Sequence, residues 1–244
     1  MLYWILLAAI IVLMIVGVVV QNKFNKTAVK YSAIPTKNGK TAAEVARLIL
    51  EEHNIEGIVI ARGKSVQFSD NFNPQNKTVT LSQSVYDSTS IAAIAIAAHE
   101  VGHVIQYSKQ TTLIKIRTTL VKPVMITQQI GAMIFQMGFM FALFGLIFVG
   151  TTAPFWIWSI LIAGAVMAGA SFIFSLVTLP VEYDASKRAK ENLVKLGIIS
   201  EKNDEEYKGA EKVLSAAAKT YLVGFLSALT SLLFYIFLII AARN

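Results

Sequence analysis

Cysteine is absent from this chain of 244 residues, and charged residues make up only 15% of it. Without cysteine no disulfide can form and no thiolate can hold a metal, so a metal site would have to use His and carboxylate ligands. Histidine is also scarce, with three in the whole chain. Hydrophobic residues, in contrast, reach 55% and the mean hydropathy is +0.58. This composition is more apolar than that of an ordinary soluble domain and predicts an integral membrane protein.

Four segments lack Asp, Glu, Lys and Arg and are long enough to cross about 30 Å of hydrocarbon. They are residues 2–20, 130–150, 154–179 and 221–242. The first is expected to be a retained anchor and not a cleaved signal peptide, because no basic residue precedes it and no A-x-A-like site follows it. We therefore predict a mainly α integral membrane protein with about four transmembrane helices and a small α+β unit.

Basic residues are distributed very unevenly along the chain. Every Lys and Arg except Arg243 lies within residues 21–129 or 180–220. Because basic loops stay on the cytoplasmic side, both segments are predicted to be cytoplasmic in a multi-pass plasma-membrane protein, with both termini outside. The net charge of +7 is then explained by topology and contact with anionic lipid, and nucleic-acid binding is not expected. The predicted organisation is an anchor at 1–20, a cytoplasmic α+β catalytic segment at 21–129, a transmembrane hairpin at 130–179, a cytoplasmic helical segment at 180–220 and a C-terminal transmembrane helix at 221–244.

The first cytoplasmic segment has the local signals of a small α+β unit. Thr41 and Glu44 form a T-x-x-E capping box before an amphipathic run, which predicts a helix at 42–53. Turn-rich stretches then separate short β-rich runs, which predicts a small antiparallel sheet. The strands are expected at 58–61, 65–68 and 78–81, and a further helix is expected at 90–107.

The pattern H-E-V-G-H at His99 to His103 contains two of the three histidines. On a helix these two lie at i and i+4 on one face, and both imidazoles can reach one metal ion at about 2.0–2.1 Å. Glu100 is rotated by about 100° from its neighbour, so it can act as a general base on a water at the metal without being a ligand. The pattern predicts one zinc ion per chain and a hydrolytic reaction.

The alternative is a chance match, and the surrounding sequence argues against it. Nearly every residue from 91 to 105 is apolar or small, which is typical of a helix that is buried on all sides. Burying two imidazoles and a carboxylate there without partners would cost several kcal/mol. A bound metal removes that conflict.

A catalytic zinc site takes three protein ligands and one open position, so a third ligand must be found. His53 ends the helix predicted at 42–53, where a solvated polar residue is the ordinary explanation. Glu182 is the better candidate, because Pro180 is expected to break or restart a helix beside the membrane. Asp184 fits the same position, and either acid could simply stabilise a helix dipole in a first turn. Spacing alone does not rank Glu182 and Asp184.

Several motifs together resemble the bacterial membrane-bound neutral zinc metallopeptidases that are often called YugP-like. They are D-N-F-N-P at 70–74, K-T-V-T-L-S at 77–82, S-I-A-A at 90–93, A-A-H-E-V-G-H-V-I-Q at 97–106 and V-E-Y-D-A-S at 181–186. An H-E-x-x-H followed by E-[FY]-x-A is also similar to the HtpX-type and CAAX-prenyl-protease-type membrane metalloproteases, in which the second glutamate is the third zinc ligand. This resemblance implies a gluzincin-like site with Glu182 as the third ligand, and a zincin-like fold for the α+β unit.

The chain departs from these patterns at two places. Ser186 stands where the HtpX-type pattern has an aspartate, so Asp184 is the candidate carboxylate for orienting a zinc histidine. YugP-like chains usually read D-H-Y-D-P where this one reads D-N-F-N-P. No metal or catalytic role is therefore assigned to Asp70, Asn71 or Asn73.

The reaction would need a second donor for the developing oxyanion. Tyr183, Arg188 and Tyr107 are candidates, although Tyr and Arg at a membrane surface are also common anchors. The strand at 78–82 is expected to offer an edge on which an extended substrate adds as a further strand. Gly102 is expected to allow another element to approach the motif closely.

The sequence thus favours a membrane-embedded zinc endopeptidase that hydrolyses peptide bonds of membrane-associated or misfolded proteins at the cytoplasmic face. Its expected partners are a protein or peptide substrate and the lipid bilayer. One alternative is a catalytically silent metal-binding scaffold or chaperone, against which Glu100 argues, because a structural site needs no general base. The other is a small transporter with an incidental H-E-V-G-H, although its spans carry none of the ionisable residues common in carriers.

Overall fold

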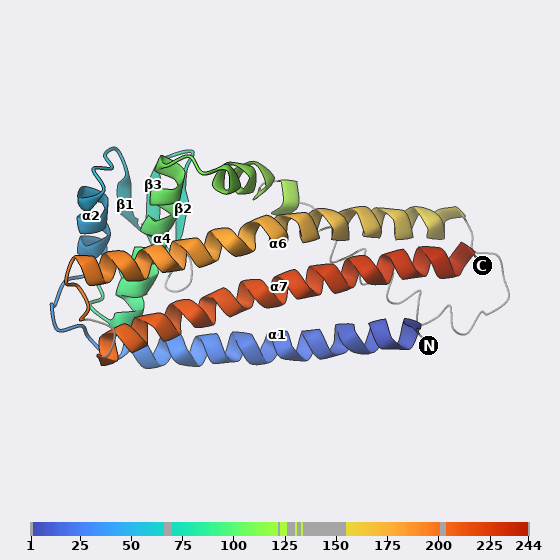
Figure 1. The fold of residues 1–244 in the computed structure, drawn as a ribbon, viewed down its shortest axis with the longest axis horizontal. Coiled ribbons are helices and arrows are strands. Elements are labelled where there is room, and N and C mark those ends of the chain that lie inside the picture. The colour runs from blue at the N-terminus through green and yellow to red at the C-terminus, as the bar shows by residue number, and fades with distance from the viewer. Residues whose placement is uncertain are drawn as a thin grey trace. The chain divides into compact units, whose positions relative to one another are not determined.

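The computed structural model describes residues 2–65, 70–121, 123–125, 130, 133, 155–200 and 204–243. Most of these residues are helical, and a small mixed sheet is present (Figure 1). The chain forms two compact units. The apolar unit comprises Met1–Val18, Ile116–Leu179 and Tyr221–Asn244, and the polar unit comprises Val19–Lys115 and Pro180–Thr220.

In the described part of the chain, three helices are long and apolar enough to cross a membrane. The candidate spans are Ala8–Ser32, Trp158–Lys195 and Glu205–Ile240. They overlap the spans predicted at 2–20, 154–179 and 221–242. The span predicted at 130–150 lies outside the described residues, apart from Ile130 and Met133.

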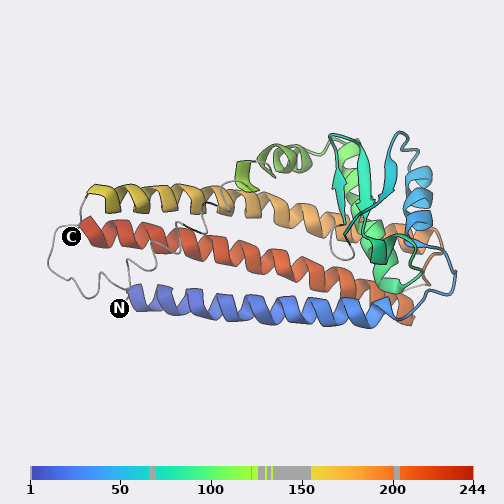
Figure 2. The same cartoon turned by 180° about the vertical axis from the view of Figure 1, so that it is seen from behind.

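The polar unit contains a capped helix and a small sheet (Figure 2). Helix α2 (Ala42–Glu52) begins with the predicted capping box between Thr41 and Glu44, which confirms that signal. The strands are β1 (Val59–Arg62), β2 (Asn71–Asn73) and β3 (Thr78–Leu81).

The sheet differs from the prediction in two respects. Its order is β1-β3-β2, with β1 parallel and β2 antiparallel to β3, so it is mixed and not antiparallel. Strand β2 lies in the turn-rich stretch between the strands predicted at 65–68 and 78–81, and most of the strand predicted at 65–68 lies outside the described residues. Since β3 is the central strand, the expectation that 78–82 offers a free edge was wrong.

Two further helices follow the sheet, α3 (Gln83–Tyr86) and α4 (Ile91–Ser108). The hydroxyl of Ser90 caps α4 by accepting a hydrogen bond from the backbone N–H of Ala93 at 3.3 Å. Most side chains of α4 are buried, as its apolar sequence predicted. They pack mainly against α2, so the core of the polar unit surrounds the H-E-V-G-H helix.

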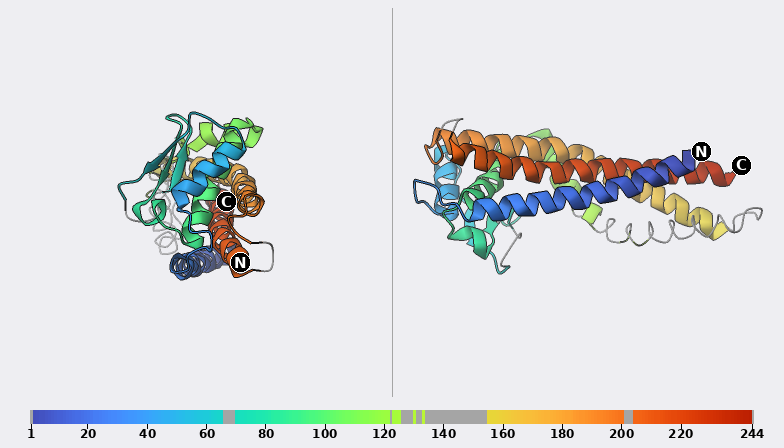
Figure 3. Two further views of the ribbon diagram at one scale, coloured as in Figure 1. Left: turned by 90° about the vertical axis from the view of Figure 1, so that its left-hand side faces the viewer. Right: turned by 90° about the horizontal axis from the view of Figure 1, so that it is seen from below.

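Three long helices run unbroken through residues of both units (Figure 3). They are α1 (Leu2–Ser32), α6 (Phe155–Lys195) and α7 (Glu205–Arg243). Within the apolar unit α6 packs closely on α7, because a Cβ on Gly164 would lie 2.2 Å from a ring carbon of Tyr235.

Helix α6 corrects the expectation for Pro180, which was expected to break or restart a helix. The helix continues through this residue, and Glu182 and Asp184 lie in its interior. A proline removes one backbone hydrogen bond. The helical turns of α6 that follow Pro180 are stabilised by packing, since Val181 and Ala185 are 3% and 0% exposed. Neither acid therefore stabilises the dipole of a first turn.

Candidate metal centre

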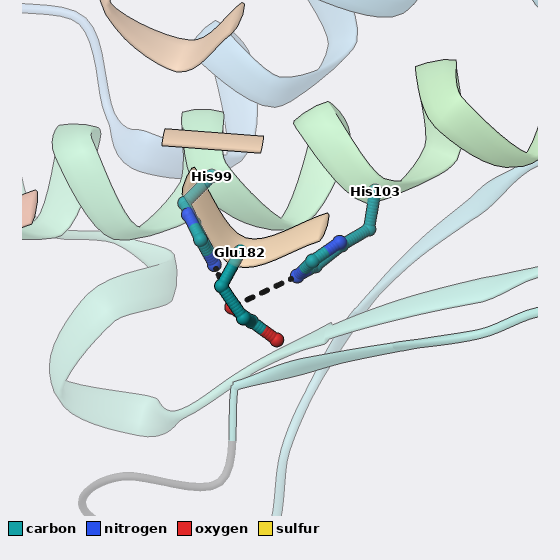
Figure 4. Close-up of side chains that lie close together, drawn as sticks. All are labelled: His99, His103 and Glu182. Atoms are coloured by element: carbon teal, nitrogen blue, oxygen red, sulfur yellow. Dashed lines mark hydrogen bonds and ion pairs between the residues drawn. The ribbon is translucent and has the colours of Figure 1, made fainter. Parts of the chain in front are cut away.

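Helices α4 and α6 place two imidazoles and one carboxylate around a common point (Figure 4). The rings of His99 and His103 have centroids 4.8 Å apart and planes inclined at 81°. Glu182 Oε2 lies 3.1 Å from Nε2 of His99 and 3.5 Å from Nε2 of His103. The structure thus brings together residues that are 83 positions apart in the chain.

These distances suit a metal ion. Ligands at about 2.0–2.1 Å from a tetrahedral zinc ion lie about 3.3 Å from one another, and the two measured separations bracket that value. The centre is also well shielded, since the side chains of Glu182, His103 and His99 are 1%, 6% and 14% exposed. A carboxylate buried to this degree requires a cation or several hydrogen-bond donors as partners.

Gly102 allows α4 and α6 to approach closely enough to form this centre. A Cβ on Gly102 would lie only 2.7 Å from the backbone oxygen of Ala185. Because that neighbour is backbone, it cannot rotate away as a flexible side chain would. The close approach expected at Gly102 is present, and it brings Glu182, one turn before Ala185, opposite the histidines.

Gln106 orients His103. Its amide nitrogen donates hydrogen bonds to the backbone oxygen of Val181 and to Oδ2 of Asp184, both at 2.8 Å. Its amide oxygen therefore faces Nδ1 of His103, at 3.0 Å. An amide oxygen only accepts hydrogen bonds, so Nδ1 of His103 must carry the proton and donate.

The arrangement has a direct consequence for Nε2 of His103. In a neutral imidazole whose Nδ1 is protonated, Nε2 is an acceptor with an available lone pair. This lone pair faces a carboxylate oxygen of Glu182, which is also an acceptor. Two acceptors repel each other unless a proton or a metal cation lies between them. The donor set therefore fits a metal ion that is bound by nitrogen and oxygen.

Ser186 and Asp184 support the centre in different ways. The hydroxyl of Ser186 lies 3.2 Å from Nδ1 of the candidate ligand His99. Serine thus stands beside this histidine at the position where the HtpX-type pattern has an aspartate. Asp184 reaches His103 only through Gln106. Partial burial raises the pKa of Asp184, but hydrogen bonds from Arg188 and Gln106 outweigh burial and hold the pKa below its usual value. Asp184 thus stays ionised and keeps the Gln106 amide in place.

The residues predicted as general base and as oxyanion donors also lie in the polar unit. Glu100 is buried on α4 beside His99, with 9% exposure. The hydroxyl-bearing ring of Tyr183 is about half exposed, whereas Tyr107 packs edge-on against Phe72 of β2, with ring centroids 5.7 Å apart. Arg188 donates from Nε to Asp184 at 2.7 Å.

His53 and Asp70 have structural partners. His53 ends α2, and its Nε2 lies 2.7 Å from the amide oxygen of Asn192, so it does not join the metal-ligand group in the described part of the chain. Asp70 accepts hydrogen bonds from the backbone N–H and hydroxyl of Ser82 at 2.7 Å and 3.2 Å. Burial raises the pKa of Asp70, against the opposing effect of these bonds.

Gln106 is the residue of this site that sequence reasoning missed. Its signal was its position three residues after His103, which places it on the same helical face. Glutamine is common on helices, however, and only its partners Val181 and Asp184 show its part in the site.

A buried His-His-Glu cluster has the ligand types of a metallohydrolase, and its glutamate lies on a helix that contains a candidate membrane span. The chain matches the model of the family described as "Putative neutral zinc metallopeptidase" over residues 4–240, and it belongs to that family. It is also 32% identical over 224 residues to "Putative membrane protease YugP" of Bacillus subtilis (strain 168), with 92% of each chain covered. The resemblance to the YugP-like neutral zinc metallopeptidases is thereby confirmed. No solved structure gives a significant match.

Proposed function

We propose that this protein is a membrane-embedded zinc endopeptidase of the gluzincin type. His99, His103 and Glu182 would hold one zinc ion, and Glu100 would act as the general base. The observation that carries the proposal is the pairing of Nε2 of His103 with Oε2 of Glu182 at 3.5 Å, two atoms that are both acceptors when His103 is neutral and Glu182 is ionised, and that a cation between them would hold together. The family to which the chain belongs supports zinc as that cation.

A zinc ion held at this centre would act as a Lewis acid, polarising a peptide carbonyl and lowering the pKa of a bound water. Glu100 accepts the proton of the attacking water and transfers it to the leaving amine. Gln106 and Ser186 hold the imidazoles in the orientation that presents Nε2 to the centre. Tyr183, which is about half exposed, and the Nη donors of Arg188, whose Nε is engaged by Asp184, are the candidate oxyanion donors.

The substrates we propose are membrane-associated or misfolded proteins, cleaved at the cytoplasmic face. Two features support this. Glu182 lies on the same helix as a candidate membrane span, and the polar unit contains most of the basic residues, which favour the cytoplasmic side. Both termini would then lie outside, and the division into spans and cytoplasmic segments would follow the sequence prediction.

Zinc content tests the proposal. The detergent-purified wild-type protein is expected to contain about one zinc ion per chain and His99→Ala much less, because two remaining ligands do not complete a catalytic site. Elemental analysis measures both. His53→Ala is the matched control, since this histidine pairs with Asn192. Metal-free wild-type protein, or equal zinc in all three proteins, would contradict the proposal.

Gln106→Leu is expected to lower zinc affinity by about 10–100-fold, which is typical for loss of a group that orients a metal ligand. Leucine has a similar size but cannot accept from Nδ1 of His103, so the imidazole loses its fixed tautomer. Competition with a chelator measures the affinity. Gln83→Leu is the control, because Gln83 is an exposed residue whose side chain donates to the backbone oxygen of Lys64 at 3.3 Å. Equal affinity in Gln106→Leu and wild type would exclude the orienting role.

A further inference from the structure

Helices α1 and α7 run side by side within the polar unit (Figures 1 and 3). A groove that is rich in lysine lies between them. Its volume is about 770 Å³. The lysines that line it are Lys23, Lys26 and Lys30 of α1 and Lys212 and Lys219 of α7.

The positions of these lysines follow the helical repeat. Those of α1 are spaced i, i+3 and i+7, and those of α7 are spaced i and i+7, so each set lies on one face of its helix. The small residues Ser215 and Ala216 line the groove between the two lysines of α7 and leave room for a ligand. The sequence thus places two basic faces opposite each other across an open space.

The described lining of the groove is positively charged. Among the described residues that line it, none is acidic. None of its lysines forms an ion pair in the part of the chain that the structure describes, although Lys190 pairs with Glu211 at 3.0 Å and Lys195 with Glu52 at 2.6 Å. Like charges around one cavity repel, and a bound anion relieves that repulsion.

The ends of the groove indicate which anion it would take. It begins at Val19 and Val20, the last residues of the apolar run at 2–20, and on α7 it ends at Lys219, just before the apolar run at 221–242. Both helices therefore change from polar to apolar sequence at the groove. In a membrane protein this change occurs at the level of the lipid headgroups. We propose that the groove binds the phosphate headgroup of an anionic phospholipid.

A lipid headgroup bound in the groove would also stabilise the packing of the polar unit. Tyr31 lines the groove, and a Cβ on Gly209 would lie 2.7 Å from its ring and 3.0 Å from the side chain of Ile91. Tyr31 in the wall of the groove thus packs against α7 at Gly209, and the same glycine packs against the first residue of α4. A headgroup held by lysines of α1 and α7 would keep these contacts closed, so the ligand is expected to raise the Tm.

The test uses the full chain in a neutral detergent, with phosphatidylglycerol as the probe and phosphatidylcholine as the uncharged reference. In one variant all five groove lysines are changed to Gln. The matched control changes five exposed lysines elsewhere in the polar unit, Lys40, Lys64, Lys77, Lys109 and Lys208, and so alters the net charge equally. A fourth protein, the double variant Lys26→Gln with Lys212→Gln, is used if the fivefold groove variant does not fold.

We expect phosphatidylglycerol to raise the Tm of wild type and of the control variant. Its affinity should fall at least about tenfold in the groove variants and less than about twofold in the control, given the attraction that each Lys near an anionic surface contributes. Equal losses in the two fivefold variants would overturn the proposal, because net charge alone would then explain binding. Inorganic phosphate that raises the Tm as much as the lipid does would overturn the lipid assignment in favour of a free anion.

Discussion

Glu100→Gln is expected to abolish peptide hydrolysis while the protein keeps its zinc. Glutamine has the shape of glutamate but cannot accept a proton, and a general base contributes about 10²–10⁴-fold to a rate. Metal content should be unchanged, because the group that could hold a metal consists of His99, His103 and Glu182. Cleavage of a fluorogenic peptide library, together with elemental analysis of the same samples, measures both quantities.

Glu206→Gln is the control for this experiment. Glu206 is also a buried glutamate of the polar unit, at 5% exposure, but it accepts a backbone hydrogen bond from Lys37, which glutamine can also do. This variant should cleave peptides as wild type does. If Glu100→Gln cleaved equally well, Glu100 would not be the base. If wild-type protein bound zinc without cleaving any peptide, a silent metal-binding scaffold would become the better interpretation.

Glu182→Ala is expected to lower zinc affinity by more than about a hundredfold. Loss of a group that merely orients a ligand already costs about 10–100-fold, and Glu182 Oε2 faces both imidazoles directly. Metal titration with a chromophoric chelator measures the change. Circular dichroism of the metal-free variant shows whether the helices persist without the carboxylate.

Asp184→Asn provides the comparison on the same helix. Asp184 contacts the centre only through Gln106, and asparagine can still accept from that amide. Its zinc affinity should therefore fall no more than about tenfold, less than for loss of an orienting group. The reverse ranking, with Asp184→Asn more damaging than Glu182→Ala, would move the third ligand to Asp184.

The parts of the centre that depend on helical periodicity could be predicted from the sequence. The i, i+4 spacing places His99 and His103 on one face of any helix, and the apolar neighbours indicate that this helix is buried. The proposed third ligand is different, because Glu182 and Asp184 have the same chemistry and nearly the same position. Family resemblance ranked them, and the close packing of Gly102 on Ala185 supplies the physical reason why Glu182 faces the histidines.

The errors lie where tertiary context overrides local signals. Pro180 is an ordinary helix breaker, yet buried residues on its C-terminal side keep α6 continuous. Strand β2 consists of two asparagines around Phe72, which is a poor local signal for a strand, but Phe72 pairs with Val79 and packs on Tyr107. The parallel pairing of β1 with β3 joins strands that are not adjacent in the chain, and local sequence carries little information about such pairing.

The 83-residue separation between His99 and Glu182 sets an order of events during synthesis. A ribosome makes both histidines first, then residues 116–179 of the apolar unit, and only afterwards the glutamate. The nascent chain therefore lacks a complete ligand set until the segment between them has been translated. The proposed metal centre could therefore be loaded only after this intervening segment has been made.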